Sequence, residues 1–423
     1  MVTERPDGQP VRLGIVGAAR ILPAHLRGLQ AILDADLAQV RITAIAARRI
    51  EDAVMFRLRG EGPPPRPPVA TNERDPLGAP HLYASDLHAD TLPEIYDDWR
   101  TMLDDDVVDA VLILVPVGMH HTVALDCLAA GKHVLIEKPF AITVRAGQTI
   151  VEEAARRGLV AGVAEGVRYA ESARAARWVI DGGMIGALQL WISGGIGNEW
   201  SPDRIVAGTP WRHRKLAAGG GGAIDIGVHL FHQIRYLMGP VAEISAYTKT
   251  LEPERFTRDA AGTVTSGVRN EVEDVFVANL RFENGAIGTT FSSWGGHGEP
   301  TGLTADPAIY GSTGCLKGGE VVRDDGFRGK AADVFRRGAP PDLRNGYFPG
   351  GLTDPFALEM LDFLTAIAAN GSMEASGAEG VLDLATAYSV LESATIGRPV
   401  AVSDVMNGSV AAYQEEIDEH YGI

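Results

Sequence analysis

Cysteine and long apolar runs are both scarce in this sequence. Only Cys127 and Cys315 occur among its 423 residues, which is too few for a disulfide framework and is typical of a reducing compartment. No apolar run approaches the roughly 18 residues that a membrane-spanning helix requires. The first residues also lack the apolar stretch and the cleavage site of a secretory leader. We therefore expect a cytoplasmic protein with no membrane partner.

Basic residues are also in the minority. The sequence has 38 lysines and arginines against 55 aspartates and glutamates, which gives a formal net charge of −17. Such an excess of negative charge repels nucleic acid backbones and anionic lipid surfaces, so we expect no nucleic acid partner. A nucleotide cofactor remains compatible with this composition, because it requires only backbone N–H donors and local positive potential.

The length and the pattern of the chain predict two domains. A chain of 423 residues exceeds what one hydrophobic core usually serves. Through residues 10–165, short apolar runs alternate with helical patterns, which is typical of a doubly wound parallel sheet with helices on both faces. The proline-rich stretch 60–80 interrupts this pattern and is expected to be a surface insertion. The expected strands are 11–16, 40–46, 110–115, 133–137 and 159–164, and the expected helices are 22–35, 91–103, 120–130 and 143–157.

Residues 166–400 have a different pattern. Alternating and β-branched runs predict an antiparallel sheet, and Glu283-Asn284-Gly285 is a tight-turn signal between two of its strands. We therefore expect an α/β protein with a second α/β domain at 166–400 and a C-terminal tail at 401–423. The expected strands are 188–192, 244–250, 275–282 and 286–293, and the expected helices are 223–237, 356–369 and 382–395.

The first strand runs into a turn that could bind a dinucleotide. The turn has the sequence Gly17-Ala18-Ala19-Arg20-Ile21 and leads into a helix, and a dinucleotide's pyrophosphate binds at such a place. The full Gly-x-Gly-x-x-Gly pattern is absent, because Ala19 and Leu22 stand where its later glycines would be. Taken alone, the segment is equally consistent with an ordinary strand-to-helix turn.

The end of the second strand has no acidic residue to bind a ribose 2′-hydroxyl. Arg48 and Arg49 stand there instead, and two guanidinium groups suit a 2′-phosphate through charge-assisted, bidentate contacts. This feature predicts NADP as the cofactor, with NAD as the second choice. The alternative is that both arginines are solvated charges at a helix start, or stack on the adenine.

A lysine and a histidine are the candidate catalytic residues. Glu137 and Lys138 end a buried strand, and the carboxyl ends of parallel strands bind ligands in open α/β sheets. Asp225 and His229 follow the glycine run 219–222 and share one face if a single helix begins there. Each feature has a structural alternative: a surface charge, a helix ion pair and a flexible loop.

These residues suit the oxidation of an alcohol. A neutral imidazole at His229 can accept the hydroxyl proton as hydride leaves carbon. Lys138 can hold the hydroxyl oxygen and relay the proton, and Asp225 can orient His229 or bind a substrate hydroxyl.

The chain resembles the Gfo/Idh/MocA oxidoreductases, named for glucose-fructose oxidoreductase, inositol dehydrogenase and a rhizopine-catabolism protein. The matching segments follow the family's order and cover nearly the whole chain. The combination of Glu-Lys-Pro with Asp-x-Gly-x-His is specific to it. The segments are GIVGAARI (14–21), VDAVLILVPVGMHH (108–121), AGKHVLIEKP (130–139), WVIDGGMIG (178–186), Trp211-Arg212, GGGAIDIGVH (220–229) and SATIGRPV (393–400).

The resemblance implies an N-terminal Rossmann domain and a C-terminal domain that binds substrate and whose open sheet forms the interface of a homodimer or homotetramer. It implies sugars, polyols or their derivatives as substrates. It places the cofactor at Gly17, Ala19, Arg20 and Ile21, near Pro116 and His120 and at Glu137-Lys138, catalysis at Lys138, Asp225 and His229, and substrate contacts at Arg168-Tyr169 and Trp211-Arg212.

Some positions depart from the family's pattern. His232 stands where the family often has an aspartate, and we expect it to contact the substrate, although this departure leaves the hydrogen bonds on the substrate side open. Two histidines three residues apart without a third ligand predict no metal site. Trp200, Trp211 and His213 either line a sugar pocket or belong to the core. The segments 60–80 and 301–351 have no counterpart.

Three functions are therefore considered. The first is a dehydrogenase or reductase that uses NADP or NAD on a sugar, polyol or glycoside. The second is a redox-neutral epimerase, eliminase or glycosidase that recycles a tightly held NAD. The third is a non-catalytic dinucleotide sensor, which would bind cofactor and turn over no substrate.

Overall fold

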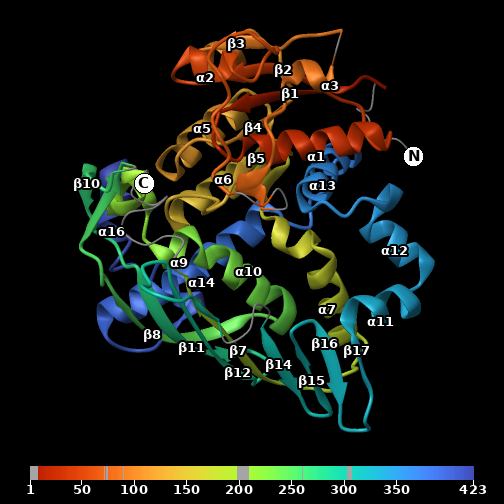
Figure 1. The fold of residues 1–423 in the computed structure, drawn as a ribbon, viewed down its shortest axis with the longest axis vertical. Coiled ribbons are helices and arrows are strands. Elements are labelled where there is room, and N and C mark those ends of the chain that lie inside the picture. The colour runs from red at the N-terminus through yellow and green to blue at the C-terminus, as the bar shows by residue number, and fades with distance from the viewer. Residues whose placement is uncertain are drawn as a thin grey trace. The chain divides into compact units, whose positions relative to one another are not determined.

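The computed structural model describes residues 8–70, 72, 75–88, 90–197, 209–259, 261–302 and 307–423, although not the side chains of 301–302. The chain divides into two compact units, and Figure 1 shows the elements of both. The first unit consists of Met1–Ala141, Gly147–Tyr169 and Asn345–Gly380. The second consists of Ile142–Ala146, Ala170–Arg344 and Val381–Ile423.

The first unit contains a six-stranded parallel sheet in the order β3-β2-β1-β4-β5-β6. The order reverses between β1 and β4, and open α/β sheets bind ligands at such a point, at the carboxyl ends of the strands. The doubly wound fold predicted from the sequence is confirmed. Its strands are β1 (Val11–Val16), β2 (Val40–Ala46), β3 (Glu94–Tyr96), β4 (Ala110–Ile113), β5 (His133–Glu137) and β6 (Ala161–Ala164).

Short connections and helices join these strands. The helices, including single 3-10 turns (η), are α1 (Leu22–Asp34), α2 (Ile50–Val54), η1 (Pro76–Gly78), α3 (Ala84–Leu87), α4 (Trp99–Asp104), η2 (Val117–Met119), α5 (His120–Ala129), α6 (Val144–Arg157) and η3 (Gly166–Tyr169). The stretch 60–80 lies among them between α2 and α3, and it contains no strand in its described part.

A helix from far along the chain packs on α1. In α1, Leu22, Leu26 and Leu29 form part of a buried stripe, and α13 (Pro355–Ala369) covers it (Figure 1). The two helices approach closely at Gly28, where a Cβ would lie 2.8 Å from the backbone of Ala357. Residues 345–380 thus belong to the first unit, whereas we expected 166–400 to form one second domain.

The second unit is built on a ten-stranded sheet. Its main path is β17-β16-β15-β14-β7-β12-β11-β8-β18, with β13 paired to β7, and β7 and β12 are the parallel neighbours in it. The strands are β7 (Leu188–Ile196), β8 (Val241–Lys249), β11 (Val275–Phe282), β12 (Ile287–Ser293), β13 (Thr301–Gly302), β14 (Ala308–Gly311), β15 (Gly314–Lys317), β16 (Glu320–Arg323), β17 (Arg328–Lys330) and β18 (Val400–Ala401).

The predicted hairpin joins β11 to β12, and Gly285 in its turn has a φ of 87°. Strands β9 (Glu254–Arg258) and β10 (Val264–Arg269) form a separate ribbon. The described residues hold no helix long and apolar enough to cross a membrane. The remaining helices are α7 (Glu171–Asp181), η4 (Pro210–His213), α8 (Lys215–Ala218), α9 (Gly222–Asp225), α10 (Gly227–Met238), α11 (Ala331–Gly338), α12 (Pro341–Tyr347), η5 (Pro349–Gly351), α14 (Gly377–Ile396), α15 (Val402–Met406) and α16 (Glu415–Tyr421).

Candidate active site

The turn between β1 and α1 requires glycine at its first position. Gly17 has a φ of 102°, and a Cβ there would lie 2.6 Å from the carbonyl oxygen of Leu114. Its N–H donates to the carbonyl of Ala46 at 2.8 Å. The helix then begins at Leu22 without a side-chain cap. Glycine at this position lets the turn pack against the backbone that follows β4, and a turn that leads into a helix N-terminus fits the pyrophosphate of a dinucleotide.

Three of the predicted arginines lie near this turn. The parallel pairing of β1 and β2 sets Val16 opposite Ala46, so the residues after both strands share the carboxyl edge of the sheet. Arg48 and Arg49 follow β2 and are exposed, and Arg49 lies 4.0 Å from Asp52. Arg20, next to Ala19 in the turn, lines a hollow at the same edge. This edge therefore carries the positive charge that an anionic nucleotide requires.

Glu137 holds the backbone of Lys138 against α1. One oxygen of its carboxylate, Oε1, lies 3.1 Å from Nε2 of His25, and the other accepts the N–H of Lys138 at 2.9 Å. His25 belongs to α1 and is fully buried. These contacts fix the carboxyl end of β5 and therefore the backbone position of Lys138, whose side chain is half-buried. We expected Glu137 to contact the cofactor; its carboxylate instead organises this end of the strand.

A second carboxylate lies on the other side of His25. Glu359 of α13 is 1% exposed, and its Oε1 is 3.8 Å from Nδ1 of His25. Burial, and then the charges of Glu137 and Glu165, raise the pKa of Glu359 well above its ordinary value. A carboxyl group held in its neutral form can lie next to Glu137 without charge repulsion.

His120 connects the loops that follow β4 and β5. Its Nδ1 lies 2.8 Å from the carbonyl of Pro139, and its Nε2 lies 2.9 Å from that of Val115, next to Pro116. The ring is buried, and burial lowers the pKa of His120. We expected a cofactor contact from His120; its ring nitrogens face backbone carbonyls instead, so it helps to position the residue after Lys138.

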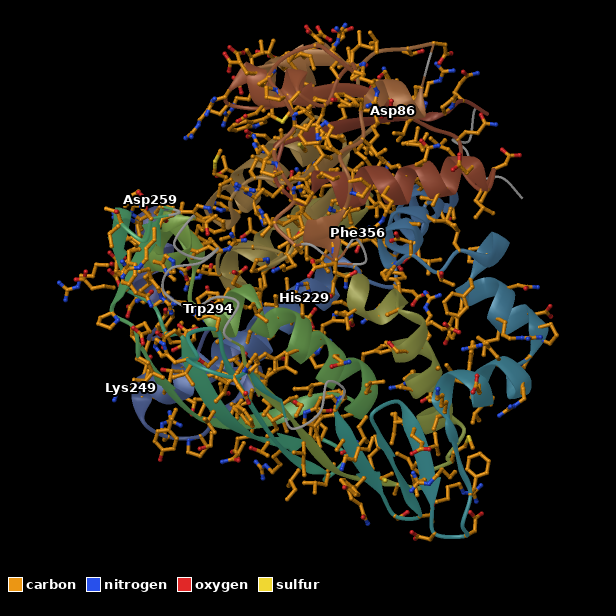
Figure 2. All side chains as sticks on the ribbon, in the orientation of Figure 1. Asp86, His229, Lys249, Asp259, Trp294 and Phe356 are labelled. Carbon is orange, nitrogen blue, oxygen red and sulfur yellow. The ribbon has the colours of Figure 1, made fainter. Side chains whose placement is uncertain are left out.

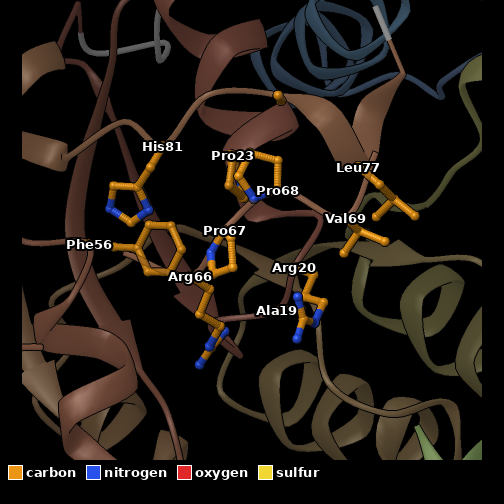
Figure 3. Close-up of a pocket in the computed structure, with 11 residues that line it drawn as sticks. Ala19, Arg20, Pro23, Phe56, Arg66, Pro67, Pro68, Val69, Leu77 and His81 are labelled. Carbon is orange, nitrogen blue, oxygen red and sulfur yellow. The ribbon is translucent and has the colours of Figure 1, made fainter. Parts of the chain in front are cut away.

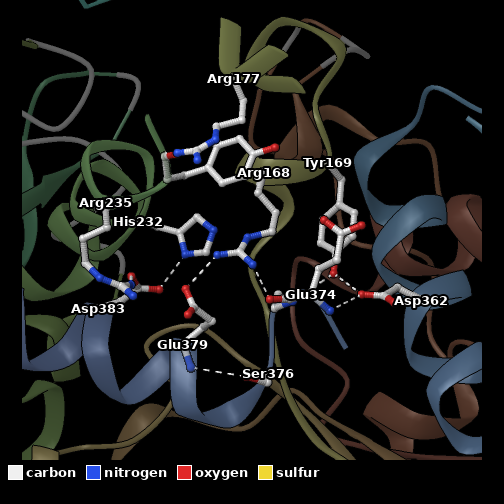
Figure 4. Close-up of polar contacts among 12 residues, drawn as sticks. Arg168, Tyr169, Arg177, His232, Arg235, Asp362, Glu374, Ser376, Glu379 and Asp383 are labelled. Atoms are coloured by element: carbon white, nitrogen blue, oxygen red, sulfur yellow. Dashed lines mark hydrogen bonds and ion pairs between the residues drawn. The ribbon is translucent and has the colours of Figure 1, made fainter. Parts of the chain in front are cut away.

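Arg168 and Tyr169 are held inside the first unit (Figure 4). Arg168 lies 2.8 Å from Oε2 of Glu379, and the hydroxyl of Tyr169 donates to Oδ2 of Asp362 at 2.6 Å. Both side chains are buried, and burial raises the pKa of Tyr169 well above its ordinary value. These contacts join the turn after β6 to α13 and to the start of α14, a structural role that the sequence did not predict.

In the second unit, a buried carboxylate holds the glycine run. Glu273 accepts the N–H of Gly221 at 3.0 Å and that of Ala223 at 2.8 Å. A Cβ on Gly221 would lie 1.8 Å from the carbonyl oxygen of Glu273, so the two segments approach as closely as glycine allows. Burial raises the pKa of Glu273 to about 7. The start of α9 thus has a fixed position rather than that of a flexible loop.

The expected single helix after the glycines is wrong. Helix α9 ends at Asp225, and α10 begins at Gly227. The N–H of Ile226 donates to the carbonyl of Gly222 and closes the single turn of α9, and Ile226 lies between the two helices. Asp225 instead accepts a hydrogen bond from Nε of Arg212 at 2.9 Å.

Arg212 lies over the ring of Trp211, with its guanidinium carbon 4.6 Å from the ring centre. The predicted residues Trp211, Arg212 and Asp225 therefore form one cluster. His213, which follows them, is fully buried and belongs to the core. Trp200 lies outside the described residues.

The two histidines of α10 have different surroundings. His229, in the first turn of the helix, is half-buried and is labelled in Figure 2. His232 is fully buried, with its Nδ1 2.7 Å from Oδ2 of Asp383, which also pairs with Arg235 (Figure 4). His232 therefore joins α10 to α14, which differs from the predicted substrate contact. Among the described residues, no three His, Cys, Asp or Glu side chains are grouped as metal ligands.

Comparison with known proteins identifies the family. Residues 11–165 match the oxidoreductase family with an NAD-binding Rossmann fold, and residues 173–317 match the GFO/IDH/MocA C-terminal domain. The chain belongs to the GFO/IDH/MocA oxidoreductase family. The resemblance predicted from the sequence is thus confirmed, and the chain is an oxidoreductase with an NAD-binding Rossmann domain.

The relatives of this protein include two sugar or polyol dehydrogenases. Levoglucosan dehydrogenase of Pseudarthrobacter phenanthrenivorans is 30% identical over 319 residues, which cover 70% of this chain and 80% of that protein. Myo-inositol 2-dehydrogenase of Thermotoga maritima is 24% identical over 398 residues, which cover 94% of this chain and all of that protein.

Solved structures of the GFO/IDH/MocA family support the fold. Levoglucosan dehydrogenase in complex with NADH and levoglucosan has a TM-score of 0.70 at 23% identity, and the match covers 93% of this chain and 99% of that one. An oxidoreductase domain protein from Kribbella flavida has a TM-score of 0.71 at 22% identity, with the same coverage.

The sequence did not predict a role for four residues around the proposed site. They are His25, Arg66, Glu273 and Glu359. His25 offered a signal, because it is a polar residue within the apolar stripe of α1. The other three act on segments tens to hundreds of residues away, and spacing along a sequence carries no information about such contacts.

Proposed function

We propose that this protein transfers a hydride between a nicotinamide cofactor and a secondary alcohol or ketone of a sugar, polyol or glycoside. The family assignment supports the cofactor, and relatives named for levoglucosan and myo-inositol support the substrate class. The observation that carries the proposal is the fixed end of β5, where Glu137 and His25 hold Lys138 at the ligand-binding edge of the sheet. A bound nicotinamide would supply or accept the hydride.

The residues have separate proposed roles. Lys138 holds the substrate oxygen and stabilises its partial negative charge. His229 accepts the hydroxyl proton during oxidation and returns it during reduction. Asp225 orients His229 or binds a substrate hydroxyl, and its pairing with Arg212 supports a further role in positioning the Trp211-Arg212 segment.

Kinetics and binding together test this assignment. Sugars, polyols and glycosides are screened with NAD and NADP in parallel, by following the absorbance of the reduced nicotinamide. We expect Lys138→Ala and His229→Ala each to lower kcat/KM by about a hundredfold or more, while His229→Ala leaves the cofactor Kd unchanged. Lys317→Ala and His420→Ala, at exposed positions, are the controls. Full activity in either catalytic variant would disprove its role.

The same experiment separates the two other functions. A redox-neutral enzyme would show no net absorbance change, would retain its cofactor through gel filtration and would convert substrate without exchange of cofactor. A dinucleotide sensor would bind cofactor in the wild type and in both variants and would turn over nothing.

NADP is the proposed preferred cofactor. Arg48 and Arg49 are exposed directly after β2, on the edge next to the turn of Gly17. Two guanidinium groups in this place favour a 2′-phosphate over a hydroxyl. A Kd for NADPH at least tenfold below that for NADH would support the preference, and the reverse ratio would overturn it.

The outer face of the second unit's sheet is the proposed oligomer interface. Tyr247, on β8, is 81% exposed and lies opposite Val277 of β11, which is 46% exposed. Ile287, on β12, is 58% exposed and lies opposite Arg281 on the same face of β11. Neighbouring exposed apolar side chains are typical of a surface that a second subunit covers. We propose a homodimer or homotetramer formed through this face.

A further inference from the structure

The proline-rich insertion contacts the turn between β1 and α1. Arg66, in the middle of the insertion, donates from Nη1 to the carbonyl of Ala18 at 2.7 Å. Its Nη2 lies 2.6 Å from Oδ1 of Asp52, in the first turn of α2. One guanidinium therefore joins the insertion to the turn that fits a pyrophosphate and to the segment after β2 that would face the adenosine ribose.

The insertion also forms one wall of a hollow beside that turn (Figure 3). Prolines on both sides of Arg66 restrict its backbone, so the arginine is carried on a stiff segment. Figure 3 shows Arg66 and Arg20 among the side chains around this hollow. The lining residues are Ala19, Arg20, Pro23, Phe56, Arg66, Pro67, Pro68, Val69, Leu77, Ala79 and His81.

Asp52 is an acidic residue close to where the adenosine ribose is expected. Its carboxylate lies 2.6 Å from Arg66 and 4.0 Å from Arg49. An uncompensated carboxylate there would repel a 2′-phosphate and could accept hydrogen bonds from ribose hydroxyls, as an acidic residue does in NAD-specific enzymes. Arg66 pairs with Asp52 more closely than Arg49 does. Arg66 therefore compensates most of the negative charge of Asp52, and Arg48 and Arg49 can pair with a phosphate instead.

We propose that Arg66 is a specificity-determining residue for the cofactor. By pairing with Asp52, it makes NADPH bind more tightly relative to NADH. The inference rests on the proposed function in placing the adenosine ribose beside β2. It assigns the insertion, which the family resemblance left without a role, to cofactor selection. The simple alternative is that Arg66 anchors the insertion mechanically, in which case its loss would weaken both cofactors equally.

Cofactor binding tests this directly. The Kd values of NADPH and NADH are measured by the change in nicotinamide fluorescence on binding to the full-length wild type and to each variant. For Arg66→Ala we expect the Kd of NADPH divided by that of NADH to rise on the order of tenfold. The reason is that the uncompensated carboxylate of Asp52 would repel the 2′-phosphate from several ångströms away, which has an effect of roughly this size. The change in ratio should shrink as salt is raised, since mobile ions screen it.

Two further variants separate charge from anchoring. Asp52→Asn removes the carboxylate and should lower the ratio, in the direction opposite to Arg66→Ala. The double variant Asp52→Asn/Arg66→Ala should return the ratio to near the wild-type value, because no charge remains to be compensated. Arg66→Lys keeps the charge and should retain most of the wild-type ratio.

The matched control is Arg59→Ala. Arg59 lies just before the insertion and pairs with Asp86 in an exposed ion pair. Its substitution removes the same charge as Arg66→Ala but leaves the pair of Asp52 and Arg66 in place. This variant should leave the ratio unchanged. Thermal unfolding of every variant verifies that the domain is folded, and Asp52→Asn provides the test if Arg66→Ala is unfolded.

The outcomes also distinguish this inference from the proposed cofactor preference. A wild type that binds NADH more tightly would overturn the NADP preference, yet Arg66→Ala would still raise the ratio if the inference holds. Equal losses for both cofactors in Arg66→Ala, with no change in Asp52→Asn, would overturn the inference and leave Arg66 as an anchor.

Discussion

His25 and Glu137 are joined by a contact of 3.1 Å between Nε2 and Oε1, and this contact connects α1 to the strand end that carries Lys138. The other oxygen of the Glu137 carboxylate accepts the N–H of Lys138. The buried imidazole thus lies between the carboxylate of Glu137 and the carboxyl group of Glu359. The position of the proposed catalytic lysine thus depends on the first helix of the chain.

The first prediction concerns this contact. Glu137→Gln keeps the size and an acceptor oxygen but removes the carboxylate charge, so the contacts with His25 and with the N–H of Lys138 weaken and Lys138 is held less firmly. We expect kcat to fall about tenfold, with the cofactor Kd changed less than threefold. Stopped-flow and steady-state kinetics measure the first, and fluorescence titration the second.

Glu165→Gln is the matched control, because Glu165 is another buried carboxylate of the same unit that contributes to the raised pKa of Glu359. An equal loss of kcat in both variants would contradict a specific role for the His25–Glu137 contact.

The second prediction concerns stability and pH. Burial raises the pKa of Glu273 to about 7, whereas an unfolded glutamate titrates near 4.5. Between these values the folded protein binds more protons than the unfolded chain, so the free energy of unfolding should fall as pH rises from about 4.5 to about 7. The full difference is on the order of 3 kcal/mol. Urea unfolding at a series of pH values measures it.

Glu273→Gln should flatten this dependence, because an amide does not titrate and its oxygen can accept both backbone N–H groups that Oε1 accepts. Glu271→Gln, at an exposed position on the same loop, should leave it unchanged. Other buried carboxyl groups with a raised pKa, such as Glu359, leave a smaller residual slope, and a slope as steep in Glu273→Gln as in the wild type would show that Glu273 does not contribute.

The third prediction concerns the turn after β1. Gly17→Ala adds a Cβ that would lie 2.6 Å from the carbonyl oxygen of Leu114, at a φ of 102°. We expect the turn to shift, the Kd of NADH to rise at least tenfold, and the protein to lose about 1–3 kcal/mol of stability. Isothermal titration and thermal unfolding test the two effects.

Gly131→Ala separates the effect of a positive φ from that of a steric clash of the added Cβ. Gly131 also has a positive φ, 76°, but a Cβ there meets nothing within 4 Å. This variant should lose about 1 kcal/mol and bind NADH normally. Normal cofactor binding in Gly17→Ala would contradict the assignment of the turn to the dinucleotide.

The fourth prediction concerns the outer face of the second sheet. Tyr247→Glu places a charge on the most exposed of the large apolar side chains described, and burying it unpaired in an interface is unfavourable. We expect the oligomer to dissociate, as measured by light scattering after gel filtration. Tyr247→Phe should preserve the oligomer, and an assembly unaffected by Tyr247→Glu would exclude this face.

The sequence predicted those parts of the fold whose signals are local. The runs 11–16 and 133–137 are apolar and end at the positions where the strands end. Glu283-Asn284-Gly285 predicted a hairpin because the turn depends on its own residues. The break at Ile226 was not predictable in this way, since Asp225 and His229 have a spacing that suits one helix as well as two.

The sequence indicated the residues of the proposed site but not the residues that they contact. Lys138 and His229 were evident from motifs, but nothing near them in sequence indicates that His25 lies on Glu137 or that Asp383 lies on His232. Those pairs form only after folding brings residues more than one hundred positions apart together. For the same reason the insertion was correctly expected to interrupt the sheet pattern, while its contact through Arg66 was not.

The packing of α13 on α1 bears on how the protein is made. The first unit includes residues 345–380, which follow most of the second unit in the sequence, and Phe356 and Ala357 lie against Gly28 (Figure 2 labels Phe356). A ribosome that has synthesised only the N-terminal strands and helices has therefore not yet supplied the cover for Leu26 and Leu29. The nucleotide-binding unit can be completed only after the ribosome has also synthesised residues 170–344, which belong to the second unit.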